Sequence, residues 1–144
     1  MKIPEIVFHG TFRPDGMAKP ADRLTSDVGY ICTSELYEWA HYFAWCKRIQ
    51  YAKSGNLFVY EINTTKLGQD VLDHCLPPGA VDPRTLKDSW LKNLEDKMFQ
   101  ERIRIREWRF PYIPLKAVIV SNEQYLQELP YMSILNTPPP PDRR

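Results

Sequence analysis

Val7-Phe8-His9-Gly10-Thr11 is the stretch of sequence that decides how the fold is interpreted. Its apolar residues, together with Ile6, predict a short strand that is bounded by Pro4 and Gly10. His9 is therefore expected where the strand opens into a loop, and Gly10 would let a flat ligand approach bare backbone. A surface histidine at a strand end is the alternative interpretation of these five residues.

The composition is typical of a single ordinary domain. The chain has 144 residues and a formal net charge of +1, with 19 Lys and Arg against 18 Asp and Glu. This balance gives no overall signature of nucleic-acid or membrane binding. The sequence shows no signal peptide and no run of roughly 20 apolar residues, so we expect a soluble, cytoplasmic protein. We expect one domain over residues 1–135 and a proline-rich flexible tail over residues 136–144.

The cysteines and histidines show no paired spacing that would indicate a disulfide framework or a metal site. We therefore expect no metal and a reducing compartment. The residues concerned are Cys32, Cys46, Cys75, His9, His41 and His74.

The chain after the first strand predicts a loop, a second short strand and then a helix. Residues 12–28 are rich in Pro, Gly and Asp and predict a long loop or a frayed helix. Residues 29–34 predict a strand, and the apolar spacing that follows predicts a helix over 35–52 with Ser34 as its N-cap. Further along we expect a strand at 57–62, an irregular stretch at 64–83, a helix from Asp82-Pro83 to Met98, a strand at 115–120 and a helix at 122–129.

The sequence changes to period two after Glu101. Arginines at 102, 104 and 106 alternate with Ile103, Ile105 and Glu107, which predicts a strand with Glu107 on the isoleucine face. A carboxylate at the end of an inward-facing row must reach solvent, pair with a cation or serve a cleft. The arginines, with Arg109, indicate either a solvated sheet face or a grip on pyrophosphate or an acidic target.

Three segments, in this order, resemble the ADP-ribosyltransferase superfamily, in the branch of diphtheria-type toxins, poly-ADP-ribose polymerases and rifampin-modifying transferases. Phe8-His9-Gly10-Thr11 looks like the first-strand box, residues 29–44 resemble the strand-then-helix box, and residues 107–120 look like the strand that carries the catalytic glutamate. The resemblance implies an α+β fold, with a split pair of small antiparallel sheets around an NAD cleft and flanking helices.

The resemblance also implies roles for single residues. His9 would anchor the ribose on the adenosine side of NAD, and the backbone of Gly10, followed by Thr11, would meet the nicotinamide amide. Glu107 would stabilise the oxocarbenium-like ribose of the transition state, with Glu101 as the rival carboxylate. We expect His9, Tyr42 and Glu107 to converge on one cleft.

The aromatic positions depart from the family pattern. Aligning Gly29 and Thr33 places Ile31 where the family has its first tyrosine, with Tyr30 one residue early. Strand alternation sends Tyr30 and Ile31 to opposite faces. Tyr42 falls on the second tyrosine position, so we expect Tyr42 to stack on nicotinamide and keep Tyr30 as a second choice.

The implied activity is a mono-ADP-ribosyltransferase that takes NAD as its substrate. The acceptor would be a protein, a nucleic acid or a small molecule, with a macromolecule favoured. The length suits a bacterial or phage enzyme, including a toxin that is controlled by an antitoxin or an activating partner. Two alternatives stay open: an RNA 2'-phosphotransferase-like enzyme, and a transferase-like module that binds a partner without catalysis.

Overall fold

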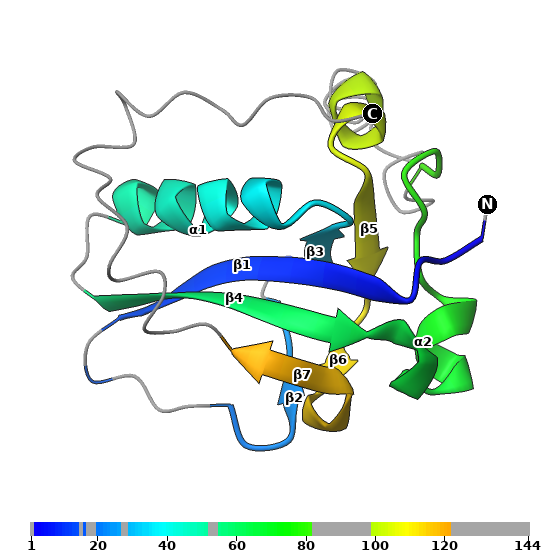
Figure 1. The fold of residues 1–144 in the computed structure, drawn as a ribbon, viewed down its shortest axis with the longest axis horizontal. Coiled ribbons are helices and arrows are strands. Elements are labelled where there is room, and N and C mark those ends of the chain that lie inside the picture. Colours follow the sequence, from blue (N-terminus) through cyan, green and yellow to red (C-terminus); the bar gives the residue numbers. More distant parts are fainter. Residues whose placement is uncertain are drawn as a thin grey trace.

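A computed structural model describes residues 2–14, 16, 20–26, 29–51, 55–81 and 99–121. Figure 1 shows the arrangement of the elements, and residues 99–104 form an additional helical turn. The elements are β1 (Ile6–Pro14), β2 (Arg23–Leu24), β3 (Ile31–Ser34), α1 (Tyr37–Tyr51), β4 (Gly55–Asn63), the 3-10 turn Thr64–Lys66, α2 (Gln69–Asp73), β5 (Glu107–Phe110), β6 (Ile113–Pro114), the 3-10 turn Leu115–Ala117 and β7 (Val118–Ser121).

The main sheet is antiparallel and has the strand order β5-β3-β1-β4-β7. β1 pairs with β4 along its whole length, from Ile6 opposite Asn63 to Pro14 opposite Gly55. Within the described residues, β1 pairs with β3 at one position, where Phe8 lies opposite Ser34. Most of the β1 edge that faces β3 is therefore free of ladder pairing. β2 and β6 form a separate two-stranded sheet.

Helix α1 covers one face of the main sheet along β1 and β4, as Figure 1 shows. Ala40 and Ala44 pack against Leu57 and Val59 there. The small side chains bring the helix close to the sheet, and a Cβ atom built on Gly10 would lie only 1.6 Å from the backbone oxygen of Ala40. Gly10 is thus required by the packing of α1.

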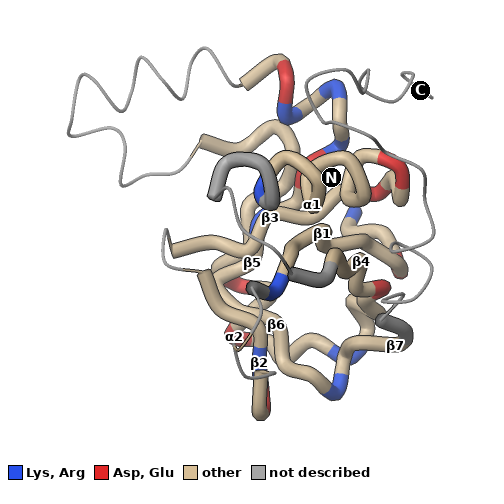
Figure 2. Tube along the Cα trace, turned by 90° about the vertical axis from the view of Figure 1, so that its left-hand side faces the viewer, with Lys and Arg blue, Asp and Glu red and all other residues tan. Residues whose placement is uncertain are grey.

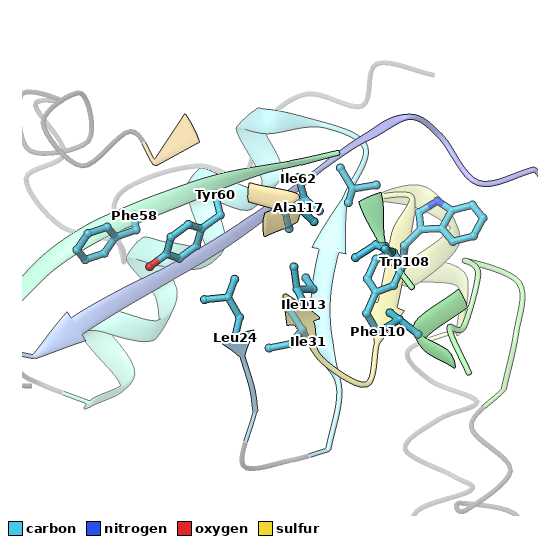
Figure 3. Close-up of a cluster of buried hydrophobic side chains, with 12 residues drawn as sticks. Leu24, Ile31, Phe58, Tyr60, Ile62, Trp108, Phe110, Ile113 and Ala117 are labelled. Atoms are coloured by element: carbon cyan, nitrogen blue, oxygen red, sulfur yellow. The ribbon is translucent and has the colours of Figure 1, made fainter. Parts of the chain in front are cut away.

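The larger hydrophobic core lies on the other face of the sheet. Figure 3 shows Phe58, Tyr60 and Ile62 of β4 facing Leu24 of β2 and Ile113 of β6. α2 contributes to the same core, which also contains Val7, Ile31, Leu67, Val71, Trp108, Phe110 and Ala117. The molecule consequently has three layers: α1, the five-stranded sheet, and the small sheet with α2.

The α+β class is confirmed, as are the expected strand at β3, helix at α1 and strand at β4. Leu36 N donates a hydrogen bond to Ser34 Oγ at 3.0 Å, but α1 begins at Tyr37, so Ser34 closes the turn before the helix and is not its N-cap. The stretch 64–83 is more regular than expected, since it holds a 3-10 turn and α2. The predicted helices at 82–98 and 122–129 and the tail at 136–144 fall outside the described residues.

The predicted end of the first strand was wrong. β1 continues through Gly10 to Pro14 because β4 is long enough to pair with all of it. His9 therefore lies in the interior of a strand, opposite Tyr60, and the loop expected over 12–28 begins later and contains β2.

The predicted strand over 101–106 was also wrong, because residues 99–104 are helical. Glu101 and Arg104 form an ion pair at the i, i+3 spacing, which a helix brings together and a strand does not. Arg106 has a left-handed φ of 54°, which ends the helical turn and directs the chain into β5. The alternation of arginine and isoleucine therefore does not describe two faces of a strand.

Charges of both signs are interspersed along the described trace in Figure 2. No described helix is long and apolar enough to cross a membrane.

Candidate functional site

The three segments that carry the family resemblance lie on three neighbouring strands, β1, β3 and β5. Phe8 lies opposite Ser34, and Ser34 lies opposite Glu107. Directly opposed residues share a face of the sheet, and residues two apart on a strand do so as well. Glu107, Cys32 and Gly10 therefore all belong to the face that α1 covers.

A cavity of about 240 Å³ lies on this face, and we call it the Glu107 cavity. Two of the predicted site residues, Gly10 and Glu107, are part of its wall. The described residues of its lining are Phe8, Gly10, Cys32, Thr33, Ser34, Ala40, Phe43, Cys46, Lys47 and Glu107.

Glu107 is a buried carboxylate that is held between two arginines. Its Oε2 lies 3.0 Å from Arg102 Nε and 3.9 Å from Arg109 Nε. Burial raises the pKa of Glu107, while the charges of Arg102 and Arg109 act to lower it. Arg109 is itself fixed by a 2.9 Å hydrogen bond from its guanidinium to Ala80 O. The site thus keeps a desolvated carboxylate in a defined place, which is what stabilisation of a cationic transition state needs.

Cys32 supplies a hydrogen bond to this carboxylate. Part of the residue is exposed, and its side chain lies in the Glu107 cavity, where the thiol is hydrogen-bonded to Glu107. Removal of the thiol from bulk water, followed by the negative charge of Glu107, raises the pKa of Cys32 to about 12. The thiol is therefore protonated and acts as the donor.

Lys47 reaches into the same cavity from α1. Its Nζ donates a 3.0 Å hydrogen bond to the backbone oxygen of Gly10. Burial lowers the pKa of Lys47. The cavity therefore contains an ammonium group at the backbone position where the resemblance places the nicotinamide amide.

His9 faces the other side of the sheet, because it alternates with Phe8 and Gly10 along β1. Its Nδ1 is 2.7 Å from Cys32 O, and a carbonyl oxygen only accepts, so Nδ1 carries the proton and Nε2 is free to accept one. Burial, followed by the charge of Lys47, lowers the pKa of His9 to about 3. The imidazole is neutral, and its ring stacks on Tyr60 with the centroids 6.3 Å apart.

A second cavity, of about 300 Å³, lies beside His9, and we call it the His9 cavity. Arg13 places its guanidinium 4.1 Å above the Phe58 ring and donates a 3.3 Å hydrogen bond to Tyr60 Oη. Arg23 adds a second positive charge. The described residues of its lining, none of which is a carboxylate, are His9, Thr11, Phe12, Arg13, Pro20, Arg23, Leu24, Thr25, Phe58 and Tyr60.

His9 and Glu107 do not line a single cavity, so their expected convergence on one cleft is not observed. The two cavities lie on opposite faces of the sheet. The described lining of the His9 cavity comes from β1, β4, β2 and the residues that flank β2, whereas β3 and β5 contribute to the Glu107 cavity. Cys32 links them, because its backbone oxygen accepts from His9 and its thiol lies in the Glu107 cavity.

The predicted aromatic residues lie outside both linings. Tyr42 makes an edge contact with Trp39, at 5.7 Å between ring centroids, and the neighbouring Phe43 lines the Glu107 cavity instead. Tyr30 precedes β3, and Ile31 is buried in the core on the other face of the sheet.

Lys47 and Cys32 were missed by sequence reasoning. A usable signal existed for Lys47, because it follows Phe43 at the i, i+4 spacing and therefore shares its face of α1. The contact of Cys32 with Glu107 depends on the pairing of β3 with β5, and no local pattern reports it.

Among the described residues, no group of three His, Cys, Asp or Glu side chains is placed to hold a metal ion.

Comparisons of the chain with protein-family models, with curated proteins and with solved structures each gave no match.

Proposed function

We propose that this chain is an NAD-dependent mono-ADP-ribosyltransferase. The observation that carries the proposal is that Gly10 and Glu107, which come from two separate segments of the family resemblance, line one cavity. His9 lines a second cavity on the opposite face of the sheet. A ligand with two chemically different halves suits two cavities of different character.

The Glu107 cavity would take the nicotinamide ribose. Phe43 provides an aromatic wall for the ring, at the position next to the expected Tyr42. The His9 cavity would take the adenosine diphosphate half, because Arg13 and Arg23 offer guanidinium groups to phosphate oxygens and His9 Nε2 offers an acceptor to a ribose hydroxyl. NAD would then have to span the sheet near the edge between β1 and β3, and the hydrogen bond from His9 to Cys32 O would open to make the split that the family fold implies.

The reaction requires the bond between the ribose C1' and the pyridinium nitrogen to break, and nicotinamide leaves with the bonding electron pair. Positive charge develops on the ribose, and Glu107 opposes it. The acceptor nucleophile then bonds to C1' and gives up its proton. Burial raises the pKa of Glu107, Arg102 and Arg109 oppose that rise and favour the charged form, and Cys32 orients the carboxylate.

The acceptor that we favour is a macromolecule. The setting that we favour is the cytoplasm of a bacterial or phage-infected cell, where the protein could act as a toxin that an antitoxin or an activating partner controls. Incubation with labelled NAD and separate pools of cell protein, RNA and DNA tests the proposal. We expect the label to enter one pool and nicotinamide to be released, both dependent on Glu107. Absence of label in every pool together with absence of nicotinamide release would contradict the proposal.

A binding module without catalysis is the second candidate, and one observation favours it. Lys47 already occupies the backbone oxygen of Gly10, and Glu107 is already paired with Arg102. For this candidate NAD raises the melting temperature, since a ligand of the native state stabilises it, while no nicotinamide is released.

The RNA 2'-phosphotransferase interpretation receives less support from the geometry. Such an enzyme needs further histidines at the phosphate. His41 accepts a 3.0 Å hydrogen bond from Trp45 Nε1, and His74 Nδ1 lies 2.9 Å from Asp70 O. Neither histidine lines the Glu107 cavity or the His9 cavity.

A further inference from the structure

Lys47 occupies an unusual place for a lysine. Its ammonium group is directed into a cavity, where it donates to Gly10 O at 3.0 Å, and it does not extend into solvent as lysines on helices normally do. An ammonium group has three N–H donors, and the bond to Gly10 uses one of them. The remaining donors can meet a hydrogen-bond acceptor on a ligand that lies against Phe43.

Two charged side chains stand in the described lining of the cavity, Glu107 and Lys47. The carboxylate of Glu107 is paired with Arg102, whose Nε lies 3.0 Å from it. Lys47 therefore contributes a positive charge that Glu107 does not have to balance. A ring that carries a negative substituent is therefore better matched to this cavity than a neutral ring or a positively charged one.

We infer that Lys47 makes the Glu107 cavity selective for an aromatic ring with a carboxylate substituent. The ring would pack on Phe43, and the carboxylate would accept from Lys47 Nζ. This inference rests on the proposed function when it is extended to the substrate. Nicotinic acid adenine dinucleotide has a carboxylate where NAD has a carboxamide, so the same selectivity makes it the preferred substrate over NAD.

The ring chemistry supports this order of preference. The nicotinamide ring of NAD is a pyridinium with a net positive charge, whereas the nicotinate ring of the acid dinucleotide has no net charge, because its carboxylate balances the pyridinium. Transfer from either dinucleotide breaks the same bond at C1' and releases nicotinamide or nicotinate with the bonding electron pair. Lys47 changes which ring is accepted and takes no part in the bond that breaks.

The test is a calorimetric binding measurement with free nicotinate and free nicotinamide on the full chain. We expect nicotinate to bind at least about tenfold more tightly, the scale of a charge-assisted hydrogen bond compared with a neutral one. The key variant is Lys47→Gln, because glutamine keeps an N–H donor for Gly10 O and removes the charge. It should bring the ratio of the two affinities close to one, whereas Lys47→Arg should largely keep it.

Lys66→Gln is the matched control, because Lys66 lies exposed on a 3-10 turn and lines neither cavity. Urea unfolding shows whether each variant is folded, and Lys47→Met is a second uncharged variant in case Lys47→Gln is not. The release rates of nicotinate and nicotinamide from the two dinucleotides are then measured on the same proteins.

The outcomes separate the inference from the proposed function. Selective nicotinate binding that depends on Lys47, with neither dinucleotide cleaved, supports the inference and contradicts the proposed function. If NAD is cleaved but Lys47→Gln keeps the wild-type ratio of nicotinate affinity to nicotinamide affinity, the proposed function is supported and the inference is contradicted. If neither nicotinate nor nicotinamide binds and neither dinucleotide is cleaved, both the inference and the proposed function are overturned.

Discussion

Replacing Gly10 with alanine tests whether the glycine serves the packing of α1. The new Cβ would lie 1.6 Å from the oxygen, 2.5 Å from the carbon and 3.2 Å from the Cα of Ala40. All three are backbone atoms, so no side-chain rotation relieves the clash. The helix would have to move outward by more than 1 Å to reach even a tight contact, and this would loosen the packing of Ala40 and Ala44 against Leu57 and Val59.

Overpacking of a well-filled core costs about 1–3 kcal/mol, occasionally more. We expect the upper end of this range, about 3 kcal/mol, because a whole helix is displaced. For a chain of this size that loss lowers the Tm by roughly 10 °C. The free energy of unfolding is measured by urea denaturation monitored through tryptophan fluorescence and circular dichroism.

Two controls sharpen the measurement. Gly79→Ala should be nearly neutral, because a Cβ at Gly79 meets no atom within 4 Å. Adding Ala40→Gly to Gly10→Ala should not restore stability, because the obstructing atoms belong to the backbone. A loss below about 1 kcal/mol for Gly10→Ala, or rescue by Ala40→Gly, would refute the close approach of α1 to β1.

Three further outcomes follow from the contacts described above. The free energy of unfolding should fall as the pH drops below about 6.5, by about 1.4 kcal/mol per pH unit down to about 3, because the unfolded chain binds a proton at His9 that the folded chain, with His9 buried, does not. His41 acts in the same direction, so the contribution of His9 is the difference in urea unfolding between wild type and His9→Gln. Parallel pH profiles for the two proteins would contradict the burial of His9. Cys32→Ser keeps a hydrogen-bond donor for Glu107 and should preserve kcat within a few-fold, whereas Cys32→Val should lower kcat about tenfold with KM little changed. Equal rates for the two variants would show that the Cys32 thiol does not orient Glu107. Arg106→Gly should raise the free energy of unfolding by up to about 1 kcal/mol, because Arg106 has a φ of 54° that glycine adopts without strain; a destabilised variant would show that the Arg106 side chain outweighs the strain.

The elements that periodicity predicted well are those in which one pattern dominates. α1 begins two residues after the predicted start and buries the alanines that its spacing places on one face, and β4 follows its apolar run. The residues after Glu101 show the limit of this method. Six alternating residues fit a strand, yet residues 99–104 are helical, with an ion pair between Glu101 and Arg104 and a left-handed Arg106 after the helical turn. A short alternating run cannot report which local contact prevails.

The candidate site was predictable only where it depends on local sequence. The predicted set of His9, Tyr42 and Glu107 does not share a lining, whereas Gly10 and Glu107, from the first and third segments, do. The face of His9 could not be known without the full length of β1, because each added residue of strand alternates the side. The cavity charge contributed by Lys47 required the position of α1 over β1, which is a property of tertiary packing.

The most direct test of the central claim is the rate of nicotinamide release from NAD by wild type and by Glu107→Gln. The variant keeps the volume of the side chain and removes the charge, so turnover should fall by roughly a hundredfold or more, the scale of about 3 kcal/mol of electrostatic stabilisation. NAD affinity should change far less, and Glu101→Gln, which alters an exposed carboxylate paired with Arg104, should keep full activity. Nicotinamide release that is unchanged in Glu107→Gln, or lost in Glu101→Gln instead, would contradict the assignment of Glu107 as the catalytic carboxylate.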